Sequence, residues 1–301
     1  MFKIDHIQDE NSNLDQVELK STDNKSQAKI AIRLGGSLQE LLLDNQMIIK
    51  NLSPLSYDVS YASAILFPFT NRVENGEYTF GQNQYSLEVN SKEENNALHG
   101  LVYNKTFRLV DEETCDDYAS ITLSYDEVEK VKGFPFYYTL YLTYILRQST
   151  LELKVIVKNK DEKAFPFNIG WHPYFWSTDL YHSFLSVDSN KKISFDEKMI
   201  PVKVDDINLN GEIQVRGKSF DDCYVLNNNE VDFRTPDYCV NIRSSSHENY
   251  LQIYTPEGID AIAIEPVTGP SNSFNNKFGL QVLNAGEEYN VTWIIKIKDD
   301  E

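Results

Sequence analysis

Hydrophobic residues alternate with polar ones along much of this 301-residue chain, and that period of two constrains the fold more than any other feature. Residues 140–146 carry Leu or Tyr at every even position, and residues 151–157 carry Leu or Val at every odd position. Successive side chains of a strand point to opposite faces, so each segment predicts a strand with one buried face. The short segment between them predicts a hairpin. Residues 291–297 alternate in the same way and predict another strand near the C-terminus.

The rest of the chain offers more strands and few helices. Further candidate strands cover residues 29–34, 249–254 and 260–265. Turn-forming pairs punctuate the candidate strands, namely Asn75-Gly76, Asn210-Gly211, Glu257-Gly258 and Ala285-Gly286. No helical period extends beyond two or three turns, and residues 57–66 are a candidate for a short helix. With no Pro- or Ser-rich linker and no repeat, the sequence predicts one all-β domain over residues 1–301, a large antiparallel β-sandwich.

The charge balance excludes several functions. The chain has 46 Asp and Glu residues against 28 Lys and Arg residues, so its formal net charge is −18. Nucleic acids and anionic membranes attract basic surfaces, so we expect neither as a partner. The N-terminus lacks the apolar core of a signal peptide, and the longest apolar stretch, residues 134–146, is too short to span a membrane. These features predict a cytoplasmic protein.

The cysteines and the absent motifs argue against bound metals and cofactors. Three cysteines occur, Cys115, Cys223 and Cys239, and no two have the CxxC spacing. Buried free thiols are therefore favoured over a single disulfide bridge. The sequence lacks GxGxxG, Walker, HExxH and GxSxG motifs, and its acidic and histidine residues have no close metal-binding spacing. We expect no cofactor and no metal ion.

His172 lies in an unusual aromatic segment, residues 167–175, with the sequence FNIGWHPYF. If the segment is extended, His172 points to the same side as Asn168 and Gly170, where small or polar neighbours leave room for a ligand. The aromatic rings nearby suit the apolar C–H face of a sugar. A structural histidine in an aromatic core is the competing interpretation, and composition alone favours it.

Glu265 ends the apolar run of residues 260–265 and precedes a proline. Alternation places its side chain beside two small ones, Ala261 and Ala263. A carboxyl group in such surroundings suggests burial, which raises its pKa toward neutrality and suits general-base chemistry. The competing interpretation is a strand-end glutamate that faces water just before a turn.

Three further positions are candidates for ligand binding. Arg72 follows an apolar and tight segment, so its guanidinium either pairs with a buried carboxylate or donates hydrogen bonds to a ligand. His99 precedes Gly100, and this glycine suggests close backbone packing. Asp221 and Asp222 begin a candidate strand. Because adjacent strand residues face opposite ways, at most one of the two lines a pocket.

Four blocks of sequence carry a resemblance to a known family. They are Asn71–Gly81 with Tyr85–Leu87, Asn90 and Leu98–Gly100; Trp171–Phe175; Phe220–Tyr224; and Ile264–Pro266. In their order and spacing over roughly residues 25–298, these blocks resemble the aldose 1-epimerase (galactose mutarotase) family.

The resemblance implies a fold, a reaction and roles for individual residues. The family fold is a large antiparallel β-sandwich, the galactose mutarotase-like supersandwich, which agrees with the alternation. The family reaction is mutarotation, the interconversion of the α and β anomers of a free hexose. Glu265 matches its general base and His172 its general acid, while Arg72, His99 and Asp221 match residues that hold the sugar hydroxyls. The implied protein is an isomerase of carbohydrate metabolism, a monomer or homodimer, that binds a small sugar without a cofactor.

The identity of the sugar stays open. Gly170-Trp171 and residues 266–272 differ from the best-known galactose mutarotases, which suggests a divergent branch. One competing function is that of a hexose-6-phosphate 1-epimerase. That enzyme needs basic residues around the phosphate, for which Arg243 and Lys277 are candidates.

Two more hypotheses differ in the reaction rather than in the sugar. A non-catalytic sugar-binding protein would keep the pocket, but binding alone does not require both Glu265 and His172. A glycosidase would use Asp221 and Glu265 as its pair of carboxyl groups, and their separation would decide that assignment.

Overall fold

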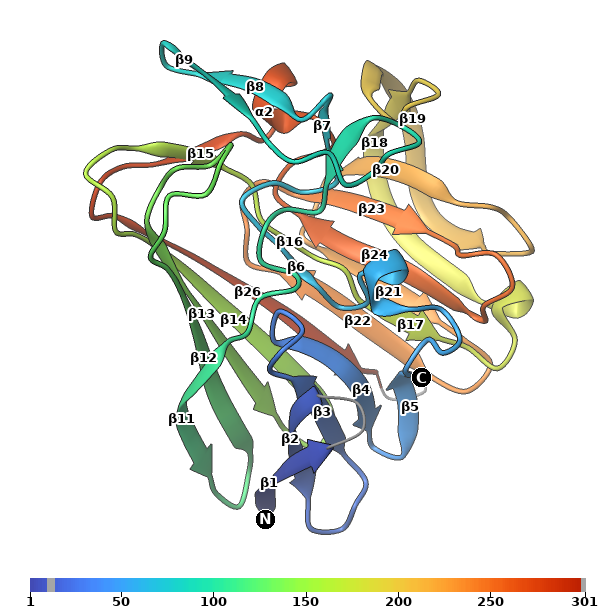
Figure 1. Ribbon diagram of the computed structural model, residues 1–301. Coiled ribbons are helices and arrows are strands. Elements are labelled where there is room, and N and C mark those ends of the chain that lie inside the picture. Colours follow the sequence, from blue (N-terminus) through green and yellow to red (C-terminus); the bar gives the residue numbers. More distant parts are fainter. Residues whose placement is uncertain (10–13, 299–301) are drawn as a thin grey trace.

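The structure, a computed structural model, describes residues 1–9 and 14–298, and strands dominate it (Figure 1). The strands are β1 (Phe2–Asp9), β2 (Leu14–Ser21), β3 (Gln27–Ala31), β4 (Ser37–Leu43), β5 (Gln46–Ile49), β6 (Ile65–Leu66), β7 (Arg72–Glu74), β8 (Glu77–Phe80), β9 (Asn83–Ser86), β10 (Asn96–Leu98), β11 (Arg108–Thr114), β12 (Ala119–Glu127), β13 (Tyr138–Leu146), β14 (Thr150–Asn159), β15 (Phe165–Phe167), β16 (Gly170–Trp171), β17 (Tyr174–Trp176), β18 (Phe184–Phe195), β19 (Pro201–Gln214), β20 (Asp221–Leu226), β21 (Glu230–Arg234), β22 (Cys239–Ser244), β23 (Tyr250–Tyr254), β24 (Ala261–Val267), β25 (Gln281–Leu283) and β26 (Glu288–Ile297). Short helices α1 (Tyr57–Ser60) and α2 (Ser273–Asn276) and the 3-10 turn η1 (Leu180–His182) lie between them. The predicted all-β class is confirmed.

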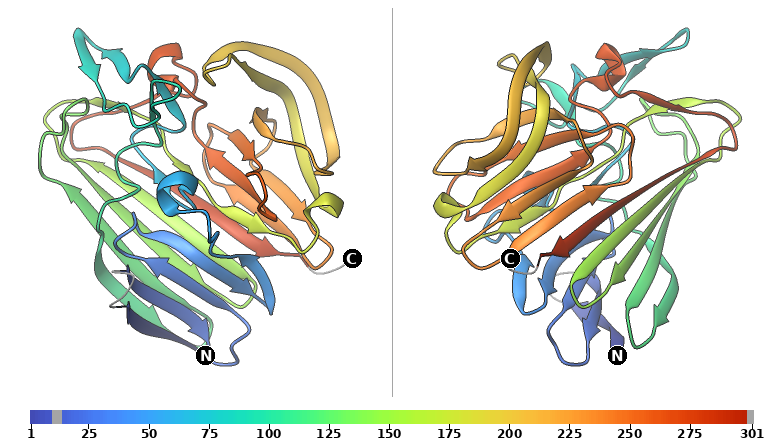
Figure 2. Two further views of the ribbon diagram at one scale, coloured as in Figure 1. Left: turned by 45° about the vertical axis from the view of Figure 1, so that its right-hand side comes forward. Right: turned by 180° about the vertical axis from the view of Figure 1, so that it is seen from behind.

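Two large antiparallel sheets form most of the structure. In the first, strands β1 to β5 lie side by side in chain order. The second follows the order β11-β12-β13-β14-β26-β22-β21-β18-β20-β23-β24-β16-β6, with β17 also paired to β24 and β19 to β18. Strands β7 and β10, β8 and β9, and β15 and β25 form small two-stranded sheets. The five-stranded sheet packs against the β11–β14 part of the large sheet, and the part from β18 to β24 curls away from it (Figures 1 and 2).

The predicted hairpin is confirmed as β13 and β14. Leu142 lies opposite Val155, and both side chains are buried, as alternation requires. On its other edge β14 pairs with the C-terminal strand β26. The β26 residue Trp293 stacks on Trp171 with ring centroids 6.1 Å apart, so the C-terminal strand joins the same core as the aromatic segment.

The other predicted strands agree with the structure to different extents. Residues 249–254 and 260–265 correspond to β23 and β24. The strand expected over residues 29–34 is β3, which begins earlier and ends at Ala31. The period-two pattern located these strands, but it did not define their ends.

The helix expected over residues 57–66 is wrong beyond its first turn. Helix α1 ends at Ser60, and the following Tyr61 adopts the left-handed conformation with φ +50°. Its N–H still donates to the carbonyl of Tyr57, a common way for a helix to end. Residues 65–66 then form β6, which pairs with β16.

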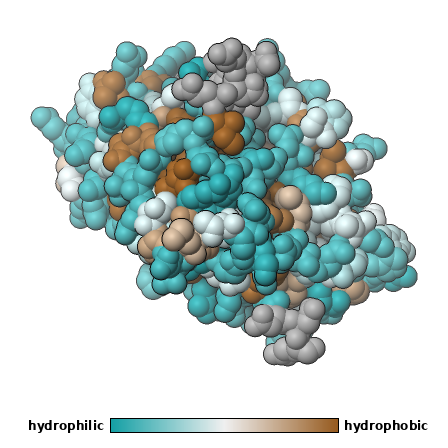
Figure 3. Space-filling view, turned by 90° about the horizontal axis from the view of Figure 1, so that it is seen from below, coloured by the Kyte–Doolittle hydropathy of each residue, from teal (hydrophilic) through white to brown (hydrophobic). Residues whose placement is uncertain are grey.

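The cysteines are free, as expected, but only Cys223 is buried, while Cys115 and Cys239 are half-buried. Within residues 1–9 and 14–298, none of the helices is long and apolar enough to cross a membrane. Hydrophilic residues cover most of the face in Figure 3, and hydrophobic residues occur on it in small groups.

Gly100 confirms the close packing that its position after His99 suggested. Its φ is +79°, and a Cβ atom there would lie 2.3 Å from the backbone oxygen of Phe67. Gly81 also has a positive φ, of +60°, but a Cβ atom there would meet nothing within 4 Å. An alanine at Gly100 would add both a clash and backbone strain, whereas an alanine at Gly81 would add backbone strain alone.

We expect Gly100→Ala to lower the free energy of unfolding by about 3 kcal/mol or more, because it adds a clash with the Phe67 backbone to the strain of a left-handed residue. Gly81→Ala adds only the strain and should cost about 1 kcal/mol. Urea unfolding curves of both variants and the wild type would measure the difference. Equal losses in the two variants would contradict the close packing at Gly100.

Candidate active site

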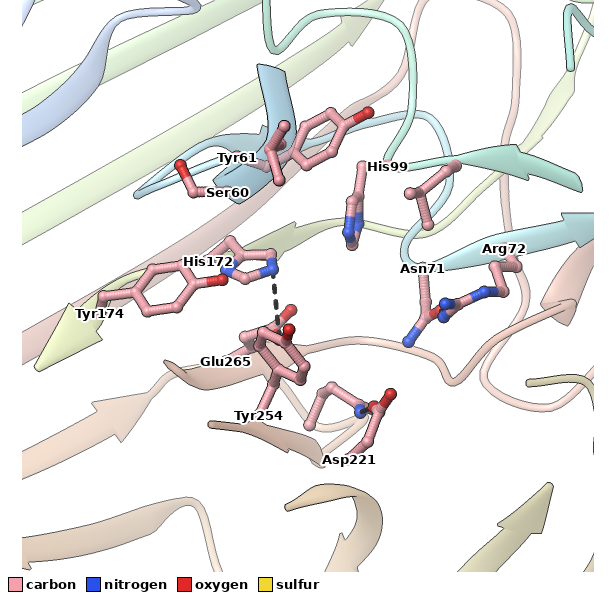
Figure 4. A pocket seen from close by; sticks show the side chains of 13 residues that line it. Ser60, Tyr61, Asn71, Arg72, His99, His172, Tyr174, Asp221, Tyr254 and Glu265 are labelled. Atoms are coloured by element: carbon pink, nitrogen blue, oxygen red, sulfur yellow. Dashed lines mark hydrogen bonds and ion pairs between the residues drawn. The ribbon is translucent and has the colours of Figure 1, made fainter. Parts of the chain in front are cut away.

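One pocket of about 270 Å³ contains all five residues that the sequence singled out (Figure 4). Its lining consists of Val59, Ser60, Tyr61, Asn71, Arg72, Leu98, His99, His172, Tyr174, Asp221, Gln252, Tyr254 and Glu265. These residues come from segments far apart in the sequence, and most carry polar side chains. Across the described ranges, no cluster of three or more His, Cys, Asp or Glu side chains is placed to hold a metal ion.

Glu265 lies in β24, a strand that is buried along its whole length. On one edge β24 pairs with β23, where Gln252 lies opposite Glu265, and on the other edge it pairs with β16 and β17. Glu265 is only 2% exposed, which rules out a glutamate that faces water. Burial raises the pKa of its carboxyl group well above the ordinary value; the charge of Asp221 raises it further, and Arg72 opposes the shift.

His172 lies at a break in the aromatic segment, just after β16 and before β17. Its backbone N–H donates to the carbonyl of Ala64, and its own carbonyl accepts from the N–H of Ser63. The segment is therefore not one extended strand, because Pro173 and the β16–β17 break interrupt it. Of the three side chains that an extended segment would place on one face, only His172 lines the pocket, while Asn168 and Gly170 pack elsewhere.

Glu265 and His172 face each other across the pocket floor. Oε1 of Glu265 lies 3.5 Å from Nε2 of His172 (Figure 4). Burial lowers the pKa of His172 to about 4, so isolation from water favours the uncharged form of both groups. Moving the carboxyl proton to Nε2 would give a carboxylate and an imidazolium without changing the total charge. The pair can therefore supply a base and an acid together.

His99 forms another wall of the pocket. Its ring packs edge-on to that of His172, with centroids 5.1 Å apart, and also contacts Tyr61 at 4.7 Å. Its φ is +62°, and its N–H donates to the carbonyl of Asn71. Burial lowers the pKa of His99 well below the ordinary value, so the ring is neutral. The Nδ1 atoms of His99 and His172 are buried and have no hydrogen-bond partner among the described residues.

Arg72 both pairs with a carboxylate and lines the pocket, so the two roles that its sequence context suggested are compatible. Its Nε and Nη2 atoms donate to Glu94 at 2.5 and 2.7 Å. Its Nη1 atom donates to Oδ1 of Asn71 at 2.7 Å. The backbone carbonyl of Arg72 accepts from the N–H of Asn272, which fixes the start of β7.

Asp221 and Asp222 point to opposite sides of β20, as alternation predicts. Asp221 lines the pocket and accepts a hydrogen bond from Nε2 of Gln252 at 2.7 Å. Asp222 pairs instead with Lys192 at 2.7 Å and accepts from the hydroxyl of Tyr224. Burial raises the pKa of Asp221 to about 6, although the charge of Arg72 opposes the shift.

Sequence reasoning did not identify most of the remaining pocket residues as part of a site. The missed residues are Val59, Ser60, Tyr61, Asn71, Leu98, Gln252 and Tyr254. Asn71 had a local signal, because it directly precedes Arg72. Gln252 had none, since only its pairing opposite Glu265 brings it to the pocket. Tyr174, expected to offer a wall to a sugar, stacks on the ring of His172 with centroids 5.1 Å apart.

Residues 15–296 match the aldose 1-epimerase family. The uncharacterized protein YihR of Escherichia coli K12 is 24% identical over 270 residues, which cover 86% of each chain. A crystal structure of a galactose mutarotase-like protein from Clostridium acetobutylicum is similar with a TM-score of 0.86 at 19% identity, over 99% of both chains. That of galactose 1-epimerase from Lactobacillus acidophilus NCFM has a TM-score of 0.81 at 16% identity, over 100% of this chain and 99% of the other.

The structural similarities identify the fold as galactose mutarotase-like, in agreement with the antiparallel sheets described above. The family match extends over nearly the whole chain and includes the strands that carry Glu265 and Asp221 as well as the segment of His172. On these grounds, the chain belongs to the aldose 1-epimerase family.

Proposed function

We propose that this protein is a mutarotase that interconverts the α and β anomers of a free hexose. The observation that carries the proposal is the buried pair of Glu265 and His172, whose Oε1 and Nε2 atoms lie 3.5 Å apart in a pocket lined by hydrogen-bonding side chains. Mutarotation needs one base and one acid close together, and this pair offers both.

The reaction begins with opening of the sugar ring. Glu265, as the carboxylate, takes the proton of the anomeric hydroxyl, while His172, as the imidazolium, gives a proton to the departing ring oxygen. The C1–O5 bond breaks and an aldehyde forms. After rotation about C1–C2, the O5 hydroxyl attacks the other face of the C1 carbonyl. In this closing step His172 acts as the base and Glu265 as the acid. Each such acid or base typically contributes about 10²–10⁴-fold to the rate.

The other polar residues would hold the sugar in the orientation that this chemistry needs. Arg72 and His99 can donate to hydroxyl groups, and Asp221 can accept from them. Gln252 already holds one Asp221 oxygen, which leaves the other for the ligand. Orientation decides whether the acid faces the ring oxygen, so these contacts affect the rate as well as the affinity.

The charged residues support an unphosphorylated substrate over the 6-phosphate. Arg243 pairs with Glu230 at 3.4 Å, and Lys277 donates to backbone carbonyls; neither lines the pocket. The contact of Glu265 with His172 supplies the acid and base of mutarotation, whereas a glycosidase would use Asp221 and Glu265 as its two carboxyl groups. A non-catalytic binding protein would differ from a mutarotase in binding the sugar without accelerating its mutarotation.

We expect wild-type protein to accelerate mutarotation of freshly dissolved α-D-galactose or α-D-glucose, followed by polarimetry. Glu265→Gln should lower kcat by about 10²–10⁴-fold and leave sugar binding largely intact, because the amide keeps the shape but cannot take the proton. Glu257→Gln, an exposed residue in the turn before β24, is the matched control. Near-normal turnover by Glu265→Gln would contradict its role, and sugar binding without any acceleration by the wild type would indicate a binding protein.

The pH dependence of kcat should follow the single proton that the Glu265–His172 pair holds. Below about pH 4 the pair gains a second proton, because burial lowers the pKa of His172 to about 4, and no base remains. As the pH rises through the raised pKa of Glu265, its carboxyl group loses the proton, and no acid remains. We therefore expect kcat, measured by polarimetry and corrected for the uncatalysed rate, to fall as the pH drops through about 4. A kcat that stays level through about pH 4 would argue against this pair.

Asp221 and Asp222 offer a direct comparison of the two faces of β20. Asp221→Asn should raise KM about tenfold or more, because a charged hydrogen bond to a sugar hydroxyl becomes a neutral one. Asp222→Asn should leave KM within about twofold, since its partners Lys192 and Tyr224 lie outside the pocket. Polarimetric rates over a range of sugar concentrations would measure both values. A larger effect from Asp222→Asn would reverse the assignment.

A further inference from the structure

Glu94 is the acidic residue that lies behind the pocket's basic side chain. Arg72 is the only Lys or Arg among the described residues that line the pocket. Glu94 belongs to the loop between β9 and β10, and both of its carboxylate oxygens accept hydrogen bonds from Arg72. Ser91, in the same loop, donates to Oε2 of Glu94 at 3.0 Å. The side chains of Arg72 and Glu94 are 14% and 24% exposed, so water screens this ion pair only in part.

The contacts fix the orientation of the guanidinium. Glu94 binds Nε and Nη2, and Asn71 binds Nη1, so three of its N–H groups are already engaged on two sides. A bidentate carboxylate contact holds the planar guanidinium in one plane. The remaining N–H groups of Arg72 are available to a ligand. Without Glu94, the long side chain would have only Asn71 to orient it.

The ion pair also determines the charge that a ligand meets. Asp221 and Glu265 line the pocket, and Glu94 offsets the positive charge of Arg72. The pKa of Asp221 is raised to about 6, chiefly by burial, with Asp222 and Glu94 contributing and Arg72 opposing. Lys192, the basic residue beside β20, pairs with Asp222 outside the pocket. An anionic group on the sugar would therefore lie near the carboxyl groups of Asp221 and Glu265, while Glu94 offsets the positive charge of Arg72.

We propose that Glu94 is a positioning residue that determines substrate class: it orients Arg72 and cancels its charge, so that the pocket accepts an uncharged hexose and rejects a phosphorylated one. The inference rests on the proposed function, because it assigns the substrate class of the same pocket. The role of Glu94 in sugar binding can be measured without turnover.

The test is calorimetric titration of wild type, Glu94→Gln and Glu93→Gln with D-galactose and with D-galactose 6-phosphate. Glu93 is exposed and lies next to Glu94, so its replacement changes the net charge of the protein equally. We expect the wild type to bind galactose more tightly than the phosphate. In Glu94→Gln that preference should fall by about tenfold or more, because Arg72 becomes an uncompensated cation, while Glu93→Gln should keep it.

Kinetics add a readout that simple loss of structure would not produce. In polarimetric assays Glu94→Gln should raise KM for galactose more than it lowers kcat, since Glu265 and His172 are untouched. Glu94→Asp, which retains the charge, should restore the preference for the uncharged sugar even if Glu94→Gln folds poorly.

An unchanged preference in Glu94→Gln, or a wild type that binds the phosphate more tightly or binds neither sugar, would overturn the inference. A wild type that binds galactose but does not accelerate mutarotation would instead contradict the proposed function, and the binding comparison would still test Glu94.

Discussion

The burial of Glu265 beside His172 is the constraint on which the rest of the pocket depends. A carboxyl group without water is stable only where its neighbours tolerate its neutral form or offset its charge. Strand β24 holds Glu265 from both edges, because its backbone groups pair with β23 on one side and with β16 and β17 on the other. The β16–β17 break then brings His172 opposite it. Sheet pairing thus supplies the rigidity that holds an acid and a base 3.5 Å apart.

Two features set the charge around this pair: the opposite faces of β20, and the loop before β10 that carries Glu94. Asp221 faces the pocket, whereas its neighbour Asp222 carries its own cation, Lys192, on the other face. Arg72 lines the pocket, and both carboxylate oxygens of Glu94 accept hydrogen bonds from its guanidinium. The chain has a formal net charge of −18, and its pocket also has more acidic residues, Asp221 and Glu265, than Lys or Arg residues. Both properties suit a neutral ligand better than an anionic one.

Sequence reasoning succeeded where structure follows from local alternation. The β13–β14 hairpin alternates with period two, and β14 buries every second side chain, so its faces could be assigned from the residues alone. The alternating Ala and Ile residues located β24, although both of its faces are buried. The reasoning failed where neighbours in space override the local pattern. The expected helix ends at Ser60, and Pro173 interrupts the aromatic segment. Gln252 and Glu94 carried no local signal, because each acquires its role from a partner distant in the sequence.

By itself, the sequence determined the all-β class, the family resemblance and five of the thirteen residues that line the pocket. Those conclusions depend on residue types and on short spacings, which are present in the chain before it folds. Only the tertiary structure decided that Glu265 and His172 are buried together, that Asp221 and not Asp222 faces them, and that Glu94 holds Arg72. Burial, pKa shifts and ion pairing arise from segments that the sheet brings together, and their register is set by contacts along the whole chain.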